Sequence, residues 1–281
     1  MKQKIVLGTA NFVQRYGLYA VGDGLPADEV AAIFATGISC FDTALAYGDC
    51  TSYFANQAQQ QPALQVTTKM SVQDDLAKTR AMLAAAQAQF GGYAHLLLHD
   101  PFKLTAADTN RLQSFFRQIL ADGLVKRIGV SIYQESDLMQ FNAIMVPQII
   151  QLPCNPLNQM TAAPWFCEYV SQHQVWVQGR SLFLQGVLLA DDLPKSLQGL
   201  QPLWRLYQQQ IRSIDSKLLA LLKWADQQSM VDQWVIGVDA ASQWQAIIQA
   251  ADTVAAMPEV CFAALQAHSH ALVDPRNWSQ T

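Results

Sequence analysis

Residues 65–100 read QVTTKMSVQDDLAKTRAMLAAAQAQFGGYAHLLLHD, and this stretch decides the fold because it joins two short apolar runs through a segment of helical length. The runs QVTTKM (65–70) and AHLLLHD (94–100) have the length of strands. A strand, a helix and a second strand in this order are typical of a βα unit in a parallel sheet. The stretch therefore predicts an α/β protein.

The same alternation runs along the whole chain of 281 residues. Eight parallel strands are the number that closes a barrel, and single barrels of this kind run to about 250 residues. We therefore expect a (β/α)8 TIM barrel forming a single domain over residues 1–281. The eight predicted strands are KIVLGTA (4–10), SCFDTA (39–44), QVTTKM (65–70), AHLLLHD (94–100), RIGVSI (127–132), QIIQLP (148–153), VWVQGRS (175–181) and QWVIGVD (233–239).

Helical patterns fill the intervals between these strands. A helix is predicted from Pro26 to Gly37, and another from a Thr105 cap to Gly123. After the seventh strand, glycines and prolines interrupt residues 182–205, so we expect a long functional loop there and a regular helix only over 207–229. A further helix is expected over 241–256.

Composition and charge exclude several classes of protein. The net charge is -4 with no Lys/Arg cluster, which argues against a nucleic-acid partner. No apolar run approaches the length of a membrane span, and no signal segment is evident, so we expect a cytoplasmic protein without a membrane partner. We expect it to be a monomer or a weak homo-oligomer. The five cysteines are scattered, and His95 and His99 lie about 13 Å apart on an extended strand. We therefore expect no disulfide framework and no metal site.

Three polar residues fall at the ends of three consecutive predicted strands: Asp42, Lys69 and His99. The carboxyl ends of parallel barrel strands open on one face, where barrel enzymes place their active sites. Tyr47 follows Asp42 in the adjoining loop and reaches the same face. Taken singly, each residue has a plain structural interpretation, such as a helix cap or a solvated side chain. Their convergence favours a catalytic group.

Four segments resemble the aldo-keto reductase superfamily: FDTALAYG (41–48), TTKM (67–70), LLLHDP (96–101) and GLVKRIGVS (123–131). The resemblance covers essentially the whole chain and keeps the order of the family's motifs. It implies an NAD(P)-dependent oxidoreductase that reduces an aldehyde or ketone. It also implies a catalytic tetrad of Asp42, Tyr47, Lys69 and His99, with Tyr47 as general acid.

Carbonyl reduction needs a hydride at carbon and a proton at oxygen, and this set of residues suits the second task. A free tyrosine, with a pKa of about 10, is a weak acid at neutral pH. A lysine ammonium beside it stabilises the phenolate, and a carboxylate keeps that ammonium charged and oriented. A histidine can donate a hydrogen bond to the substrate oxygen.

Neither a Gly-x-Gly-x-x-Gly fingerprint nor a P-loop is present, and the family binds its nicotinamide nucleotide without them. The resemblance implies that Ser131 and Gln151 hold the carboxamide and that Gly8 and Thr9 line the barrel mouth. Ordinary strand-end hydrogen bonding is the alternative for Ser131 and Gln151. Further cofactor contacts are expected from Arg180, Ser181, Leu182, Gly237, Asp239 and Gln243.

Two departures from the family pattern affect the cofactor. Arg180 stands where the family offers a tyrosine to stack on the nicotinamide; a guanidinium can stack likewise or contact phosphate. The segment IGVDAASQWQAI (236–247) occupies the position of the family's adenosine and phosphate contacts, yet no Lys or Arg occurs between Trp224 and Pro275. The 2′-phosphate of NADP prefers positively charged hydrogen-bond donors, and the carboxylate of Asp239 would repel it. A helix cap is the alternative interpretation of Asp239. The cofactor is therefore left open between NADP and NAD.

Substrate contacts are expected from aromatic residues near the barrel mouth, although such residues also serve in packing: Phe12, Tyr16, Phe102, Tyr133 and Trp278. The stretch RSLFLQGVLL (180–189) resembles a small bacterial branch of the superfamily linked to sugars, which adds a sugar-type carbonyl to the candidate substrates.

Two other functions remain open on the same fold, because a fold does not determine an activity. One is an NAD(P)H-binding sensor or regulatory protein with little turnover. The other is a cofactor-independent isomerase or lyase that uses the same carboxylate and amine.

Overall fold

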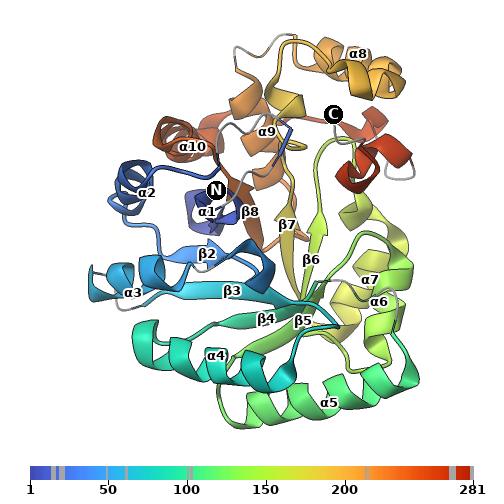
Figure 1. The fold of residues 1–281 in the computed structure, drawn as a ribbon. Coiled ribbons are helices and arrows are strands. Elements are labelled where there is room, and N and C mark those ends of the chain that lie inside the picture. Colours follow the sequence, from blue (N-terminus) through green and yellow to red (C-terminus); the bar gives the residue numbers. More distant parts are fainter. Residues whose placement is uncertain are drawn as a thin grey trace.

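Eight parallel strands close into one barrel in strict sequence order, with β8 paired to β1 (Figure 1). The computed structural model describes residues 1–13, 17–18, 23–48, 50–60, 63–99, 101, 104–212, 214, 216–265 and 270–278. All eight predicted strands are present, which confirms the (β/α)8 fold. They are β1 (Ile5–Gly8), β2 (Cys40–Asp42), β3 (Gln65–Met70), β4 (His95–Leu98), β5 (Arg127–Ser131), β6 (Ile149–Pro153), β7 (Trp176–Arg180) and β8 (Gln233–Gly237).

Helices surround the barrel and cover the outer face of the sheet (Figure 1). None of the helices in the described ranges is both long and apolar enough to span a bilayer. The helices are α1 (Ala10–Val13), α2 (Ala27–Phe34), α3 (Thr51–Gln60), α4 (Leu76–Phe90), α5 (Ala106–Ala121), α6 (Glu135–Asn142), α7 (Pro164–His173), α8 (Gln201–Gln210), α9 (Lys217–Asp226) and α10 (Ala241–Thr253).

The helix boundaries follow local capping chemistry. Helix α5 begins after Thr105, whose hydroxyl accepts a hydrogen bond from the backbone of Asp108, so the predicted cap is confirmed. The single helix predicted over 207–229 is wrong. Pro202 lies in the first turn of α8, where proline is tolerated, and the Ser216 side chain caps a separate helix α9.

The two faces of the barrel strands differ in chemistry. Side chains alternate along a strand, and the outward set packs against the helices as an apolar core. The inward set includes polar side chains: Gln178 of β7 bonds to Thr67 of β3, and strands on opposite sides can meet only through the interior. On the inner face of β5, a Cβ added to Gly129 would lie 1.8 Å from the carbonyl oxygen of Ile149, so no side chain fits there.

Candidate active site

The four predicted catalytic residues line one cavity of about 520 Å³ at the carboxyl ends of the strands. Asp42 ends β2, and Lys69 lies one residue before the end of β3. Tyr47 ends a single 3₁₀ turn, Leu45–Tyr47, and His99 directly follows β4. Strands β2, β3 and β4 are neighbours in the barrel, so the topology brings these side chains to one rim.

A buried ion pair lies at the base of this group. The Lys69 ammonium contacts the Asp42 carboxylate and donates a hydrogen bond of 3.0 Å to the carbonyl oxygen of Thr43. Lys69 is 2% exposed and Asp42 4%, so the two charges depend on each other for compensation. The ammonium nitrogen also lies 5.4 Å from the centre of the Tyr47 ring. The pair therefore places a positive charge next to the phenol.

His99 also contacts Tyr47, with the two rings edge to face and their centres 6.2 Å apart. Burial lowers the pKa of His99 to about 3, and the nearby charges of Lys69 and Arg180 act in the same direction. The imidazole is therefore neutral at physiological pH. A neutral imidazole can donate a hydrogen bond but is a poor source of a proton.

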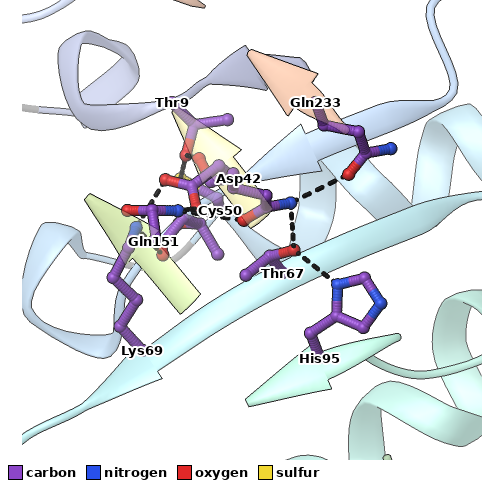
Figure 2. A network of polar contacts seen from close by, with 10 residues as sticks. Thr9, Asp42, Cys50, Thr67, Lys69, His95, Gln151 and Gln233 are labelled. Atoms are coloured by element: carbon purple, nitrogen blue, oxygen red, sulfur yellow. Dashed lines mark hydrogen bonds and ion pairs between the residues drawn. The ribbon is translucent and has the colours of Figure 1, made fainter. Parts of the chain in front are cut away.

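A chain of hydrogen bonds links Asp42 to the barrel interior, as Figure 2 shows. The side-chain amide nitrogen of Gln151 donates to Asp42 (2.7 Å) and to the side-chain oxygen of Gln178 (3.1 Å). The amide of Gln178 donates in turn to Gln233 (2.9 Å) and more weakly to Thr67 (3.4 Å). Because a carboxylate can only accept, Asp42 fixes the direction of these amides. Gln151 thus turns its nitrogen toward Asp42.

His95 forms the far end of this network, away from the active-site rim. An arginine can only donate, so Arg127, 3.3 Å away, bonds to an unprotonated Nε2 of His95. The proton then lies on Nδ1, which is 3.1 Å from the hydroxyl of Thr67. Burial, together with the charges of Arg127 and Lys126, lowers the pKa of His95 to about 4. His95 is therefore a neutral structural residue.

We expect acid to destabilise the protein through His95. The unfolded chain, with an ordinary histidine pKa of about 6.5, takes up the proton before the folded chain does, so stability falls between about pH 6.5 and pH 4. The full loss is on the order of 3 kcal/mol. Urea unfolding of the wild type and His95→Gln at a series of pH values measures it. His99 titrates in both proteins, so parallel stability curves would show that His95 carries no such penalty.

Two buried oxygen atoms near the ends of β5 and β6 have no hydrogen-bond partner within the described ranges. They are Ser131 Oγ and Gln151 Oε1, and the two residues lie opposite each other in the strand register. A buried polar atom without a partner is destabilising, typically by about 1–3 kcal/mol. A ligand with an amide NH2 group would satisfy such acceptors. Gln151 also lines the cavity, which fits the carboxamide of a nicotinamide.

Most of the other predicted cofactor residues also line the cavity. The exception is Ser131, which is buried beside it and is absent from the described lining. Thr9 is held in place there because its hydroxyl donates to the carbonyl oxygen of Asp42 (3.2 Å). The lining residues from the predicted set are Gly8, Thr9, Gln151, Arg180, Ser181, Leu182, Gly237, Asp239 and Gln243.

The turn that follows β7 is strained and lines the same cavity. Ser181, Leu184 and Gln185 all have positive φ angles (59°, 46° and 51°) although none is glycine. Each such residue costs about 1–3 kcal/mol, and strain of this kind clusters at ligand-binding segments. This turn is the first part of the long unit that the sequence marks as functional.

Arg180 projects into the cavity in a fixed orientation. Its guanidinium lies 4.2 Å from the centre of the Tyr133 ring, and the guanidinium of Arg276 lies 3.4 Å from the same ring. Arg276 is paired with Asp274. Because one face of the Arg180 guanidinium already stacks on Tyr133, a cofactor or substrate can contact only its other face or its edge.

The predicted substrate residues fall in different places. Tyr133 lines the cavity. Phe12 does not: it is 3% exposed and packs edge-on against Phe34 and Tyr53. Trp278 is outside the described cavity lining as well, and its indole donates to the carbonyl oxygen of Leu272. The structure therefore brings Tyr133 to the cavity and places Phe12 and Trp278 outside its described lining. Tyr16 and Phe102 lie outside the described residues.

Sequence reasoning missed three polar residues around the cavity: Asn11, Glu29 and Gln178. Asn11 lines the cavity, Glu29 contacts the start of α10, and Gln178 orients Gln151. Only Gln178 carries a sequence signal, since a glutamine within an apolar strand run suggests an inward-facing polar group. The partners of Asn11 and Glu29 are more than two hundred residues away in the chain.

Comparisons with known proteins agree with this fold. A model of the aldo/keto reductase family matches residues 4–269. No curated protein matches the sequence. Among solved structures, the holo form of an aldo-keto reductase from Bacillus halodurans is similar at 14% identity and a TM-score of 0.69, covering 99% of this chain and 94% of that one. A glycerol dehydrogenase from Gluconobacter oxydans is similar at 16% identity and a TM-score of 0.65, covering 90% and 91%.

At these identities the solved structures support the fold, whereas the family model covers nearly the whole sequence. This chain belongs to the aldo/keto reductase family and is thus an NAD(P)-dependent oxidoreductase.

Proposed function

We propose that this protein reduces an aldehyde or ketone to an alcohol, with NAD(P)H as hydride donor and Tyr47 as proton donor. One observation supports this most directly: the buried Lys69 ammonium, paired with Asp42, lies 5.4 Å from the centre of the Tyr47 ring. A cation in this place favours the phenolate that remains after the phenol gives up its proton.

Each residue of the group has a distinct part in this scheme. The Tyr47 hydroxyl donates its proton to the substrate oxygen, and Lys69 stabilises the resulting phenolate. Asp42 compensates the charge of Lys69 in a site where either charge alone would be strongly unfavourable. His99 is neutral, so it donates a hydrogen bond to the same oxygen and orients the carbonyl without competing as the acid.

The residues present suit a nicotinamide nucleotide, which when bound supplies the hydride. Among the residues that the structure describes, Ser131 Oγ and Gln151 Oε1 are acceptors without partners, and a carboxamide offers two N–H donors. Arg180 stacks on Tyr133 at the same rim and offers a flat cationic surface. The cavity walls formed by the turn after β7 would hold the remainder of the nucleotide.

Sugar-type carbonyl compounds are the substrates we favour. The cavity combines polar groups with an open mouth, and the segment 180–189 carries the resemblance to a branch linked to sugars. The similar structure from Gluconobacter oxydans is named a glycerol dehydrogenase, and glycerol is a polyol.

A panel of aldehydes, ketones and keto-sugars tests this proposal. Purified protein is mixed with NADH or NADPH and each compound, and cofactor oxidation is followed by absorbance. We expect steady oxidation with at least one compound and an alcohol product. Tight nucleotide binding without oxidation across the panel would favour a sensor instead. Conversion of a compound without any nucleotide would favour the isomerase or lyase alternative.

A further inference from the structure

The cavity extends well beyond the catalytic rim, to the junction of β8 and α10. Its lining runs from Tyr47 and Lys69 through Gly237 to Asp239 and Gln243, and on to Ile247 of α10. A nicotinamide that reacts beside Tyr47 fills one end of this space. An extended dinucleotide that follows the cavity toward α10 has its adenosine ribose near Asp239.

Asp239 presents a fixed acceptor at this end. Its carboxylate receives a hydrogen bond of 2.6 Å from the side chain of Asn11, which also donates to the carbonyl oxygen of Val238 (3.2 Å). The backbone N–H of Asp239 donates to Gln243 (2.8 Å). Partial desolvation raises the pKa of Asp239, although the residue as a whole is exposed. A carboxylate in this setting gains from donors such as ribose hydroxyls.

A second carboxylate already fills the start of α10. The side chain of Glu29 from α2 accepts a hydrogen bond from the backbone N–H of Ala241, the first residue of α10. The indole of Trp244 in α10 donates a hydrogen bond to the hydroxyl of Thr36 just beyond α2 (2.9 Å). Helices α2 and α10 therefore lie side by side (Figure 1). Helix N-termini attract anions, and here the protein supplies its own. The Glu29 carboxylate therefore already occupies the N-terminus of α10 that a phosphate would bind.

Cations are scarce in this part of the chain. No Lys or Arg occurs between residues 224 and 275. Lys217 of α9 precedes Leu218, which lines the cavity, but its ammonium is bound to the carbonyl oxygen of Ala190 and to the carboxylate of Asp191. A 2′-phosphate near Asp239 and Glu29 would therefore face two carboxylates, and like charges held close together are repulsive by several kcal/mol.

We propose that the nucleotide of this protein is NADH: Asp239 accepts hydrogen bonds from the adenosine ribose hydroxyls, and the carboxylates of Asp239 and Glu29 together reject a 2′-phosphate. The inference rests on the proposed function, since it presumes a nicotinamide nucleotide in the cavity. Asp239 and Glu29 would thus discriminate between the two nucleotides by attracting the ribose hydroxyls of NADH and repelling the 2′-phosphate of NADPH.

Nucleotide binding without substrate tests this inference, with quenching of the seven tryptophans as the signal. NADH and NADPH are titrated into the wild type, Asp239→Asn and Glu29→Gln. Both substitutions remove a charge and retain a hydrogen-bond acceptor. Asp252→Asn is the matched control, because Asp252 is exposed near the other end of α10 and pairs with Lys2. It changes the net charge equally without touching the cavity.

We expect the wild type to bind NADH at least about tenfold more tightly than NADPH. Asp239→Asn should narrow this ratio several-fold, mainly by improving NADPH binding, and Glu29→Gln should act in the same direction. Asp252→Asn should leave the ratio unchanged. Equal or tighter binding of NADPH by the wild type would overturn the inference while leaving carbonyl reduction intact. So would an unchanged ratio in both Asp239→Asn and Glu29→Gln. Failure to bind either nucleotide would overturn the proposed function as well.

Discussion

Tyr47→Phe should lower turnover by about three orders of magnitude, at the level typical for removal of a general acid, while nucleotide affinity stays within a few fold. The substitution removes only the hydroxyl and keeps the ring, which lies over Lys69 and edge-on to His99. Binding and stability should therefore change little, whereas the proton donor is lost. Steady-state kinetics and nucleotide titration of the same preparation measure the two quantities separately.

Tyr53→Phe is the matched control for this variant. Tyr53 lies on α3, packs edge-on against Phe12 and Phe34, and does not belong to the described lining of the catalytic cavity. Its turnover should equal that of the wild type. A Tyr47→Phe enzyme that retains more than a tenth of the wild-type turnover would remove Tyr47 from the mechanism.

Lys69→Met should abolish measurable turnover and also destabilise the fold by about 3–5 kcal/mol, the range found when one partner of a buried ion pair is removed. Asp42 would then remain as a buried carboxylate that keeps its hydrogen bond from Gln151 but has lost its cation. Urea unfolding measures the stability and steady-state kinetics the turnover.

The double variant Asp42→Asn/Lys69→Met separates folding from catalysis. An asparagine oxygen can still accept from Gln151, and no uncompensated charge is left. Stability should return close to that of the wild type, and turnover should remain absent because Tyr47 lacks its cation. A double variant that recovers both properties would show that Lys69 serves the fold alone.

The fold could be predicted from the sequence because each strand run carries its own local signal. The strand that contains Lys69 is a short run between turn residues, and the barrel then follows from the number of such runs. The clustering of Asp42, Lys69 and His99 followed from the same register, since the ends of neighbouring parallel strands must meet at one rim.

Contacts between remote segments could not be predicted in this way. Glu29 looks like an ordinary acidic residue in the first turn of α2, and only the closed barrel brings it to Ala241 of α10. The position of Phe12 outside the described cavity lining has the same origin, because its packing beside Phe34 depends on where α2 lies. Helix α8 begins earlier than predicted because Pro202 lies in its first turn and does not interrupt it, and Ser216 caps the separate helix α9.

Hydride transfer from the nicotinamide to a carbonyl carbon is the central claim, and isotope transfer measures it most directly. The protein is incubated with a carbonyl compound from the panel and with nicotinamide nucleotide carrying deuterium at the transferable position, and the product is analysed by mass spectrometry. The account predicts an alcohol that carries one deuterium on the former carbonyl carbon, formed by the wild type and about a thousandfold more slowly by Tyr47→Phe. A product without deuterium, formed while the nucleotide stays reduced, would contradict it.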